Sequence, residues 1–243
     1  MLELHYVSAG SASCRVRFCL TEKELPYEAK IVNIRDGEQN SDAYLKLNPN
    51  GLVPTLVHDS RPVWESAVIC EYLDDAFPQP PLKPADPYQR SLMRNWVKYF
   101  DEQCQPALII FNWSIRVSPY ASRWTDEELK SRLARIPTAA RREAWLRAAR
   151  NPYTEEERAG ALKTLVGVIG RMEAALTRHA WLAGDSISLA DIAAAPFVWR
   201  LRAIAPGEFG RPGLKALNDW WERIAARPGF KVAFDQEFTA HKN

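Results

Sequence analysis

The sequence predicts a small mixed α/β domain followed by a larger all-helical domain. Three observations lead to this prediction. Over the first 78 residues, segments with strand and helix patterns follow in the order β-α-β-α-β-β-α. Five prolines then fall within residues 78–87, and after about residue 88 the apolar spacing is helical throughout. The length of 243 residues is comfortable for two domains.

The first part of the α/β domain reads as strand, helix, strand. Residues 2–7 alternate apolar and polar side chains, which is typical of a half-buried strand. The small polar residues 8–13 form a loop that can cap a helix, and residues 14–25 carry an apolar helical stripe. Residues 26–34 then predict a second strand.

The second part reads as a short helix, a hairpin and a closing helix. Residues 41–50 predict a short helix that stops at an Asn-Pro pair. Residues 54–58 and 61–64 flank the turn Asp59-Ser60 as hairpin strands, and residues 65–77 have helical spacing. We therefore expect a parallel N-terminal part and an antiparallel closing hairpin.

The proline-rich stretch sets the expected domain boundaries. Residues 1–78 form the α/β domain, residues 79–87 a stiff linker, and residues 88–243 the all-helical domain. In the helical domain, Ser188 has the position of a helix N-cap, with Asp191 as its reciprocal partner. We interpret this pair as purely structural.

The composition limits the classes of partner. The formal net charge is only +2, so neither nucleic acid nor an anionic membrane surface is expected. The chain has no run of about 18 apolar residues and no basic leader, which favours a cytoplasmic protein outside the membrane. Four cysteines without a CxxC pair and four scattered histidines predict reduced thiols and no metal site.

Two residue pairs point to a binding site. Pro54 begins a strand, where it suits an edge or a bend, and a cis bond from Val53 would turn the Val53 backbone groups outward. An extended peptide could then pair with Val53 as an added strand. Ser66 opens a helix, whose free N–H groups and hydroxyl can hold a carboxylate, and Glu65 can bind an ammonium group.

Together these groups fit a small zwitterionic peptide that has an α-amino acid head and an amide. Glutathione matches this description through its γ-glutamyl end. The alternative is that Ser66 only caps a helix and Pro54 only shapes a turn. The occurrence of both pairs at this spacing, within this order of elements, favours the binding site.

Three segments resemble the glutathione transferase superfamily, and the resemblance covers nearly the whole chain. They are NPNGLVPTLV at 48–57, WESAVICEYL at 64–73 and SLADIAAAPF at 188–197. The resemblance implies a thioredoxin-like N-terminal domain, an all-helical C-terminal domain, a homodimer, and glutathione as cosubstrate. It also implies that the glutathione sulfur lies near the start of the first helix.

The residue that contacts the sulfur departs from the family pattern. In serine and cysteine classes it falls about five positions before a helix arginine, and that position here is Gly10 relative to Arg15. Ser11 and Ser13 are the hydroxyls available to stabilise the thiolate, and their alternative role is helix capping. We expect both to contact the sulfur region.

A second departure concerns the glycine end of glutathione. Many relatives carry Gln or Lys directly before the Val-Pro pair, where this chain has Leu52, which cannot make that contact. Gln39 and Asn40, ahead of the short helix, are the expected polar contacts instead.

Residues 123–157 form an insertion in the helical domain. Basic and aromatic residues interleave there, but acidic clusters on both sides argue against nucleic acid. The insertion resembles that of bacterial glutathione-dependent β-etherases, which cleave β-aryl ethers with release of a phenolate. The aromatic residues that could line a pocket for phenolic rings, or else be ordinary core, are Phe111, Trp113, Trp124 and Trp145.

Three functional hypotheses stay open at this stage. The chain conjugates glutathione to a hydrophobic, aromatic electrophile or displaces an aryl ether with it. Alternatively it is a glutathione-dependent isomerase or dehalogenase with a different pocket. The position of Gly10 also allows a binding protein without thiol activation.

Overall fold

The computed structural model describes residues 1–8 and 10–234 and confirms an α/β part followed by a helical part. The elements of the first part are β1 (Leu2–Tyr6), α1 (Ser11–Glu22), β2 (Glu28–Ile31), η1 (Glu38–Asn40), α2 (Asp42–Leu45), β3 (Thr55–His58), β4 (Arg61–Trp64) and α3 (Ser66–Ala76). The predicted order of strands and helices is thus confirmed.

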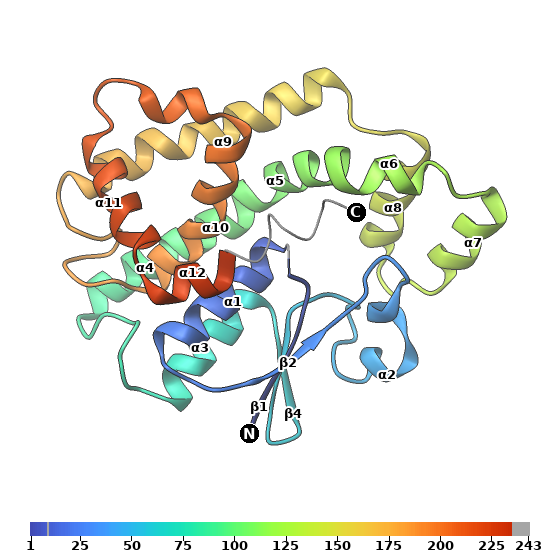
Figure 1. The fold of residues 1–243 in the computed structure, drawn as a ribbon, viewed down its shortest axis with the longest axis horizontal. Helices are drawn as coiled ribbons and strands as arrows, with labels where there is room; N and C mark the ends of the chain where they lie inside the picture. Colours follow the sequence, from blue (N-terminus) through green and yellow to red (C-terminus); the bar gives the residue numbers. More distant parts are fainter. Residues whose placement is uncertain (9, 235–243) are drawn as a thin grey trace.

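The four strands form one sheet in the order β2-β1-β3-β4. β1 and β2 are parallel, whereas β1 pairs with β3 and β3 with β4 in antiparallel register. The hairpin turn at Asp59 and Ser60 has φ values of 47° and 66°, the left-handed conformation of a tight hairpin turn. Helices α1 and α3 cover one side of the sheet and α2 lies on the other (Figure 1).

The first helix begins earlier than its apolar pattern predicts. Its helical residues start at Ser11, with Gly10 as an N-cap that has no side-chain capping bond. Residues 11–13, expected in a loop, therefore form the first turn of α1. The sequence stretch is small and polar but lacks a capping hydroxyl at the true N-cap, so the pattern placed the start too late.

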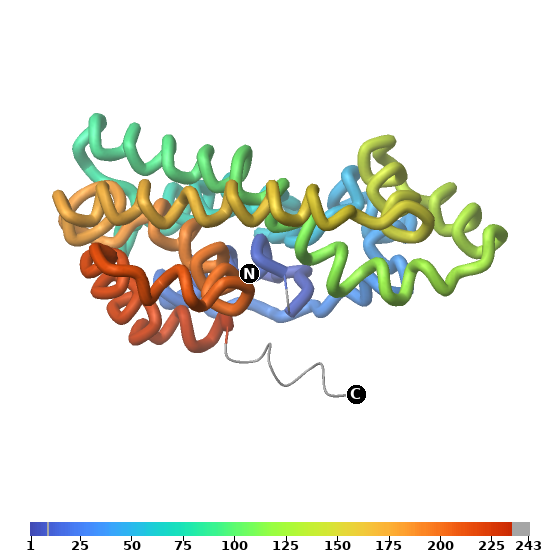
Figure 2. Tube along the Cα trace, turned by 90° about the horizontal axis from the view of Figure 1, so that it is seen from above, coloured from blue at the N-terminus to red at the C-terminus, as the bar shows by residue number. Residues whose placement is uncertain are grey.

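The helical part follows the linker. Its elements are α4 (Pro87–Tyr99), η2 (Phe100–Cys104), α5 (Gln105–Asn112), η3 (Trp113–Val117), α6 (Ser118–Ala121), α7 (Asp126–Ala134), α8 (Ala139–Arg150), α9 (Glu155–Leu176), α10 (Leu189–Ile204), η4 (Pro206–Gly210), α11 (Lys215–Ala225) and α12 (Pro228–Phe234). The segments η2 and η3 are single π-helical turns that join α4, α5 and α6. Helix α9 runs along the molecule, with α7 and α8 at one end (Figure 2).

Two hydrophobic cores stabilise these elements. The main core joins the sheet, α1 and α3 to most of the helical part, so the two domains share buried surface. A smaller core lies among η3, α6, α7 and α8 and includes Trp113, Leu129 and Trp145. The expected capping pair is confirmed, because Ser188 and Asp191 form a reciprocal capping box at the start of α10.

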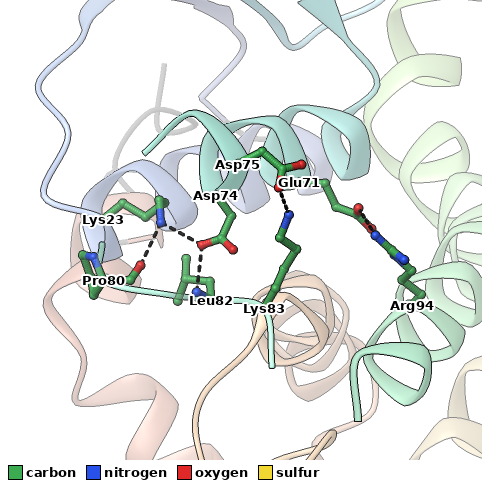
Figure 3. Close-up of polar contacts among 8 residues, drawn as sticks. All are labelled: Lys23, Glu71, Asp74, Asp75, Pro80, Leu82, Lys83 and Arg94. Carbon is green, nitrogen blue, oxygen red and sulfur yellow. Dashed lines mark hydrogen bonds and ion pairs between the residues drawn. The ribbon is translucent and has the colours of Figure 1, made fainter. Parts of the chain in front are cut away.

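A buried ion pair fastens the linker to the α/β part (Figure 3). Lys23, at the end of α1, donates to Asp74 Oδ1 on α3 and to the carbonyl of Pro80, each at 2.7 Å. The same Asp74 oxygen accepts the backbone N–H of Leu82 at 2.8 Å. Lys23 and Asp74 side chains are only 0% and 5% exposed. One carboxylate thus holds both helix α1 and the linker on α3.

We expect Asp74→Ala to lower the free energy of unfolding by about 3–5 kcal/mol, because it leaves the Lys23 charge buried without its partner. Urea unfolding measures this loss. The neighbouring Asp75 pairs with Lys83 but is 71% exposed, so it is the matched control. Asp75→Ala should cost less than about 1 kcal/mol. Similar losses for the two variants would contradict a special role for Asp74.

Candidate active site

The N-terminus of α1 opens into a cavity. The cavity lies between α1, α5, η3, α10 and α12. Its lining includes Ser11, Cys14, Asn112, Trp199 and Phe234. The first turn of α1 has N–H groups without helical partners, so this end of the helix favours negative charge. We call this space the α1 cavity.

Arginine side chains add positive charge to the α1 cavity. Arg116 and Arg200 both contribute to its lining. The Nε of Arg200 donates to Asn112 Oδ1 at 3.1 Å, which fixes one guanidinium against α5. Pattern reading missed these residues because they come from helices far apart in the sequence. The cavity combines apolar walls with cationic groups and a helix N-terminus.

The two candidate serines differ in position. Ser11 lines the α1 cavity, and its hydroxyl donates to Gln105 Oε1 at 3.2 Å. Ser13 is 1% exposed, and its hydroxyl accepts the backbone N–H of Val7 at 3.3 Å. The structure therefore brings Ser11 but not Ser13 to the cavity wall.

The packing around Gly10 explains the absent side chain at that position. A Cβ atom on Gly10 would lie 3.0 Å from Val7 Cγ1 and 3.4 Å from Ser13 Oγ. The first distance is too close for comfortable packing. A serine or cysteine at position 10 would therefore require the Val7 side chain to shift by a few tenths of an ångström. The hydroxyl nearest to that position in the lining is then Ser11.

The segment before β3 is held away from the sheet ladder. The Val53-Pro54 peptide bond is cis, as the predicted site required, and β3 begins only at Thr55. Tyr44 donates its hydroxyl to the Leu52 carbonyl at 2.7 Å, and Asn48 Nδ2 donates to the same oxygen at 2.8 Å. Burial raises the pKa of Tyr44 to about 12, so it stays a donor at neutral pH.

Glu65 and Ser66 lie where β4 passes into α3. Glu65 is exposed and serves as the N-cap of α3. Its φ is 66°, a backbone conformation that residues other than glycine seldom adopt. Ser66 is the first helical residue, and its backbone N–H lies at the positive end of α3. A strained residue that turns a carboxylate toward solvent is typical of a ligand site.

Arg15 is a site residue that pattern reading missed. Its side chain is 4% exposed, and its guanidinium donates to Ser66 Oγ at 3.2 Å and to Asp101 Oδ1 at 2.6 Å. The Nε atom is buried and has no hydrogen-bond partner among the described residues. A charged residue inside the buried stretch of α1 was the available signal. Arg15, paired with Asp101, thus places a guanidinium beside the N-terminus of α3.

Gln39 and Asn40 lie at a second, larger cavity. This cavity lies between the loop that precedes α2 and the helices α7 and α8. Trp124 and Trp145 line it as well, so the structure brings two predicted glutathione contacts and two predicted substrate contacts together. We call this space the junction cavity.

The other two predicted pocket residues lie in cores. Phe111 is buried in the main core, and Trp113 packs against Trp145 in the smaller core with ring centroids 5.1 Å apart. Neither contributes to the lining of the α1 cavity or the junction cavity. Trp145 belongs to the smaller core as well, but it also lines the junction cavity. Helical spacing alone could not show which of the four residues reach a cavity, because that depends on helices distant in sequence.

The remaining expected features concern metal, membrane and thiols. Within residues 1–8 and 10–234, no three His, Cys, Asp or Glu side chains gather as a metal site would need. No helix in that part has the length and apolar character to cross a membrane. All four cysteines are buried and form no disulfide bond, and burial raises the pKa of Cys104 to about 12.

Comparison with known proteins shows to which protein family the chain belongs. Residues 11–76 match the N-terminal domain of glutathione S-transferases and residues 138–228 match their C-terminal domain. Protein LigF of Sphingobium sp. (strain NBRC 103272 / SYK-6) is 34% identical over 97% of this chain and 93% of its own. The chain therefore belongs to the glutathione S-transferase family, as its motifs predicted.

Individual relatives show which members of the family this chain resembles. The crystal structure of beta-etherase LigF from Sphingobium sp. strain SYK-6 superposes with a TM-score of 0.87 at 33% identity, and covers 96% of this chain and 98% of the LigF chain. The probable glutathione S-transferase GSTU6 of Oryza sativa subsp. japonica is 29% identical over 95% of this chain and 86% of its own. The predicted resemblance to β-etherases is confirmed.

The conformation of Glu65 leads to a stability prediction. Glu65→Gly should leave the free energy of unfolding unchanged or raise it by up to about 1 kcal/mol, because glycine adopts positive φ without steric cost. Glu71→Gly, in the interior of the same helix, is the matched control and should lose about 1 kcal/mol. Urea unfolding compares the two variants. A loss at position 65 as large as at position 71 would show that Glu65 is not strained.

Proposed function

We propose that the protein transfers glutathione to a hydrophobic aromatic electrophile, and that β-aryl ethers are its substrate class. The observation that carries this proposal is the α1 cavity, where the Ser11 hydroxyl and the helix N-terminus meet apolar and cationic walls. Similarity to a β-etherase along nearly the whole chain supports the substrate class.

Glutathione is proposed to lie across the start of β3 and the N-termini of α1 and α3. Its γ-glutamyl carboxylate binds at Ser66, where the α3 N-terminus and the Arg15 charge favour an anion. Its ammonium group binds the exposed Glu65 carboxylate. The cysteinyl backbone pairs with Val53 before the cis-Pro54 bond, in the manner of an added strand.

The sulfur is proposed to lie at the start of α1. A free thiol has a pKa of about 8.5, and each unit by which that pKa falls requires roughly 1.4 kcal/mol. The Ser11 hydroxyl, which donates to Gln105 in this structure, would donate to the thiolate instead, together with N–H groups of the first turn. Ser13 supports this geometry through its bond to the Val7 N–H.

The reaction is a displacement at carbon. The glutathione thiolate attacks the carbon that bears the aryloxy group, a C–S bond forms, and the C–O bond breaks. The electron pair of that bond leaves on a phenolate, which then takes a proton from water. Arg116 and Arg200 place positive charge in the same cavity, which favours the negative charge that develops on the leaving oxygen. Trp199 supplies an aromatic wall.

Further parts of the proposal come from the resemblance. We propose that residues 1–78 and 88–243 act as domains joined by the linker 79–87, and that the protein is a cytoplasmic homodimer. We also propose that Gln39, Asn40, Trp124 and Trp145 contact glutathione or substrate from the junction cavity, with Phe111 and Trp113 packed behind them.

A substrate panel tests the reaction. With glutathione present, β-aryl ethers should yield one phenol and one glutathione thioether per turnover, as measured by liquid chromatography and mass spectrometry. Turnover of aryl or alkyl halides alone would favour a dehalogenase, and rearrangement without thioether would favour an isomerase. Glutathione that binds with an unshifted thiol pKa and no turnover would show a binding protein.

The role of the serines is tested by kinetics. Ser11→Ala should lower kcat/KM by roughly tenfold to a hundredfold, because the thiolate loses a hydroxyl donor, and KM for glutathione should change little. Ser13→Ala should act mainly on stability, because its hydroxyl partners Val7. An ultraviolet titration of the bound thiol should show a higher pKa in Ser11→Ala. Full activity of that variant would show that backbone N–H groups alone hold the thiolate.

The γ-glutamyl site is tested by calorimetry. Ser66→Ala and Glu65→Gln should each weaken glutathione binding by about 1–3 kcal/mol, because a carboxylate loses a donor and an ammonium group loses its counter-charge. Glu71→Gln is the matched control on the same helix, where Glu71 pairs with Arg94 instead. Unchanged affinity in both site variants would refute this placement of glutathione.

A further inference from the structure

The junction cavity contains a buried acceptor without a donor. Gln39 is 7% exposed, and its Oε1 atom has no hydrogen-bond partner among the residues that the structure describes. A buried polar atom in this state costs on the order of 1–3 kcal/mol unless a ligand or water satisfies it. Because Gln39 also lines the cavity, a ligand with an N–H group there would satisfy this oxygen.

The same cavity has a cation without a counter-charge. The side chain of Arg135 lines the cavity, is exposed at its rim, and makes no hydrogen bond, ion pair or ring contact with any described residue. Its five neighbours in the arginine-rich part of the insertion are all engaged. They are Arg132, Arg141, Arg142, Arg147 and Arg150.

The charges of the lining favour an anion. Arg132 donates to the Arg35 carbonyl at 2.8 Å and lies over the Trp124 ring at 4.4 Å, so it adds positive charge but is held in place. Asp36 is the opposing charge, and its carboxylate accepts the Asn33 amide at 2.7 Å. Two arginines against one aspartate leave the lining net positive.

The junction cavity lies next to the proposed path of glutathione. A Cβ atom on Gly51 would lie 2.7 Å from Asn40 Oδ1 and 3.3 Å from Pro137 Cδ, so the insertion packs directly over this segment. Gly51 precedes Val53 by two residues. The junction cavity is therefore close to the Val53 backbone, with which the cysteinyl residue of glutathione is proposed to pair. The glycyl residue, which follows the cysteinyl residue in glutathione, would then lie in the cavity.

We propose that Arg135, a residue of the helical insertion, binds the glycyl carboxylate of glutathione, and that Gln39 Oε1 accepts the glycyl amide N–H. This inference rests on the proposed function. It gives each unsatisfied group a partner of matching chemistry: a carboxylate for the guanidinium and an N–H for the buried oxygen. It also supplies, from the C-cap of α7, the polar contact that Leu52 cannot make.

The experiment compares glutathione with its glycyl monoethyl ester, which keeps the amide N–H but lacks the carboxylate charge. Calorimetry measures Kd of both ligands for the unmodified protein, Arg135→Gln and Lys130→Gln. Lys130 is the matched control, because it is an exposed cation on the same helix and does not line the cavity. The unmodified protein and Lys130→Gln should bind glutathione roughly ten to thirty times more tightly than the ester.

In Arg135→Gln this preference should fall to about twofold or less, through weaker binding of glutathione and unchanged binding of the ester. Gln39→Met should weaken both ligands by similar factors, because both keep the N–H group. A preference for glutathione that persists in Arg135→Gln would overturn this inference and leave the proposed function intact. Failure of the unmodified protein to bind either ligand would overturn both.

Discussion

The Lys23–Asp74 ion pair is the constraint on which the arrangement of the two parts depends. It is buried, and the same carboxylate that neutralises Lys23 accepts the Leu82 N–H in the middle of the proline-rich linker. The chain thus leaves α3 in a fixed direction and enters α4 already docked on the α/β part. The α1 cavity has walls from both parts, so it depends on the way in which the two parts are held together.

A second buried charged residue connects the Lys23–Asp74 ion pair with the candidate active site. Arg15 lies on the same helix as Lys23 and reaches both Ser66 on α3 and Asp101 in the π-helical turn η2. Asp101 holds the guanidinium in place, and the guanidinium holds the Ser66 hydroxyl. One helix therefore contributes the anchor of the linker, the positive charge near α3 and the N-terminus that faces the α1 cavity. A shift of α1 would disturb all three.

Short-range signals explain how much of the structure could be predicted from the sequence. The hairpin turn at Asp59-Ser60 and the capping box of Ser188 and Asp191 depend on neighbouring residues, and both are present. The direction of a side chain into a cavity depends on distant elements instead. Ser13 turns to Val7 and Trp113 to the smaller core, and no local pattern distinguishes them from Ser11 and Trp124.

Arginines of the insertion pack against aromatic rings. Arg141 lies over the Trp113 ring at 4.6 Å and Arg132 over Trp124 at 4.4 Å, so these guanidinium groups serve as packing partners of the smaller core. Burial lowers the pKa of Arg141, which is the electrostatic cost of using a cation in this way.

The packing of arginines on aromatic rings also affects the shape of the junction cavity. Cation–aromatic contacts make α7 and α8 a small body with its own core, attached to the loop before α2 by the Arg132 bond to the Arg35 carbonyl. The junction cavity lies at the interface between α7, α8 and the α/β part. A change in the length of the insertion or in its aromatic residues would therefore change the shape of the junction cavity, while β3, Glu65 and Ser66 stay in place. Under the proposed placement of glutathione, such a change would alter one end of the ligand site and leave the other end in place.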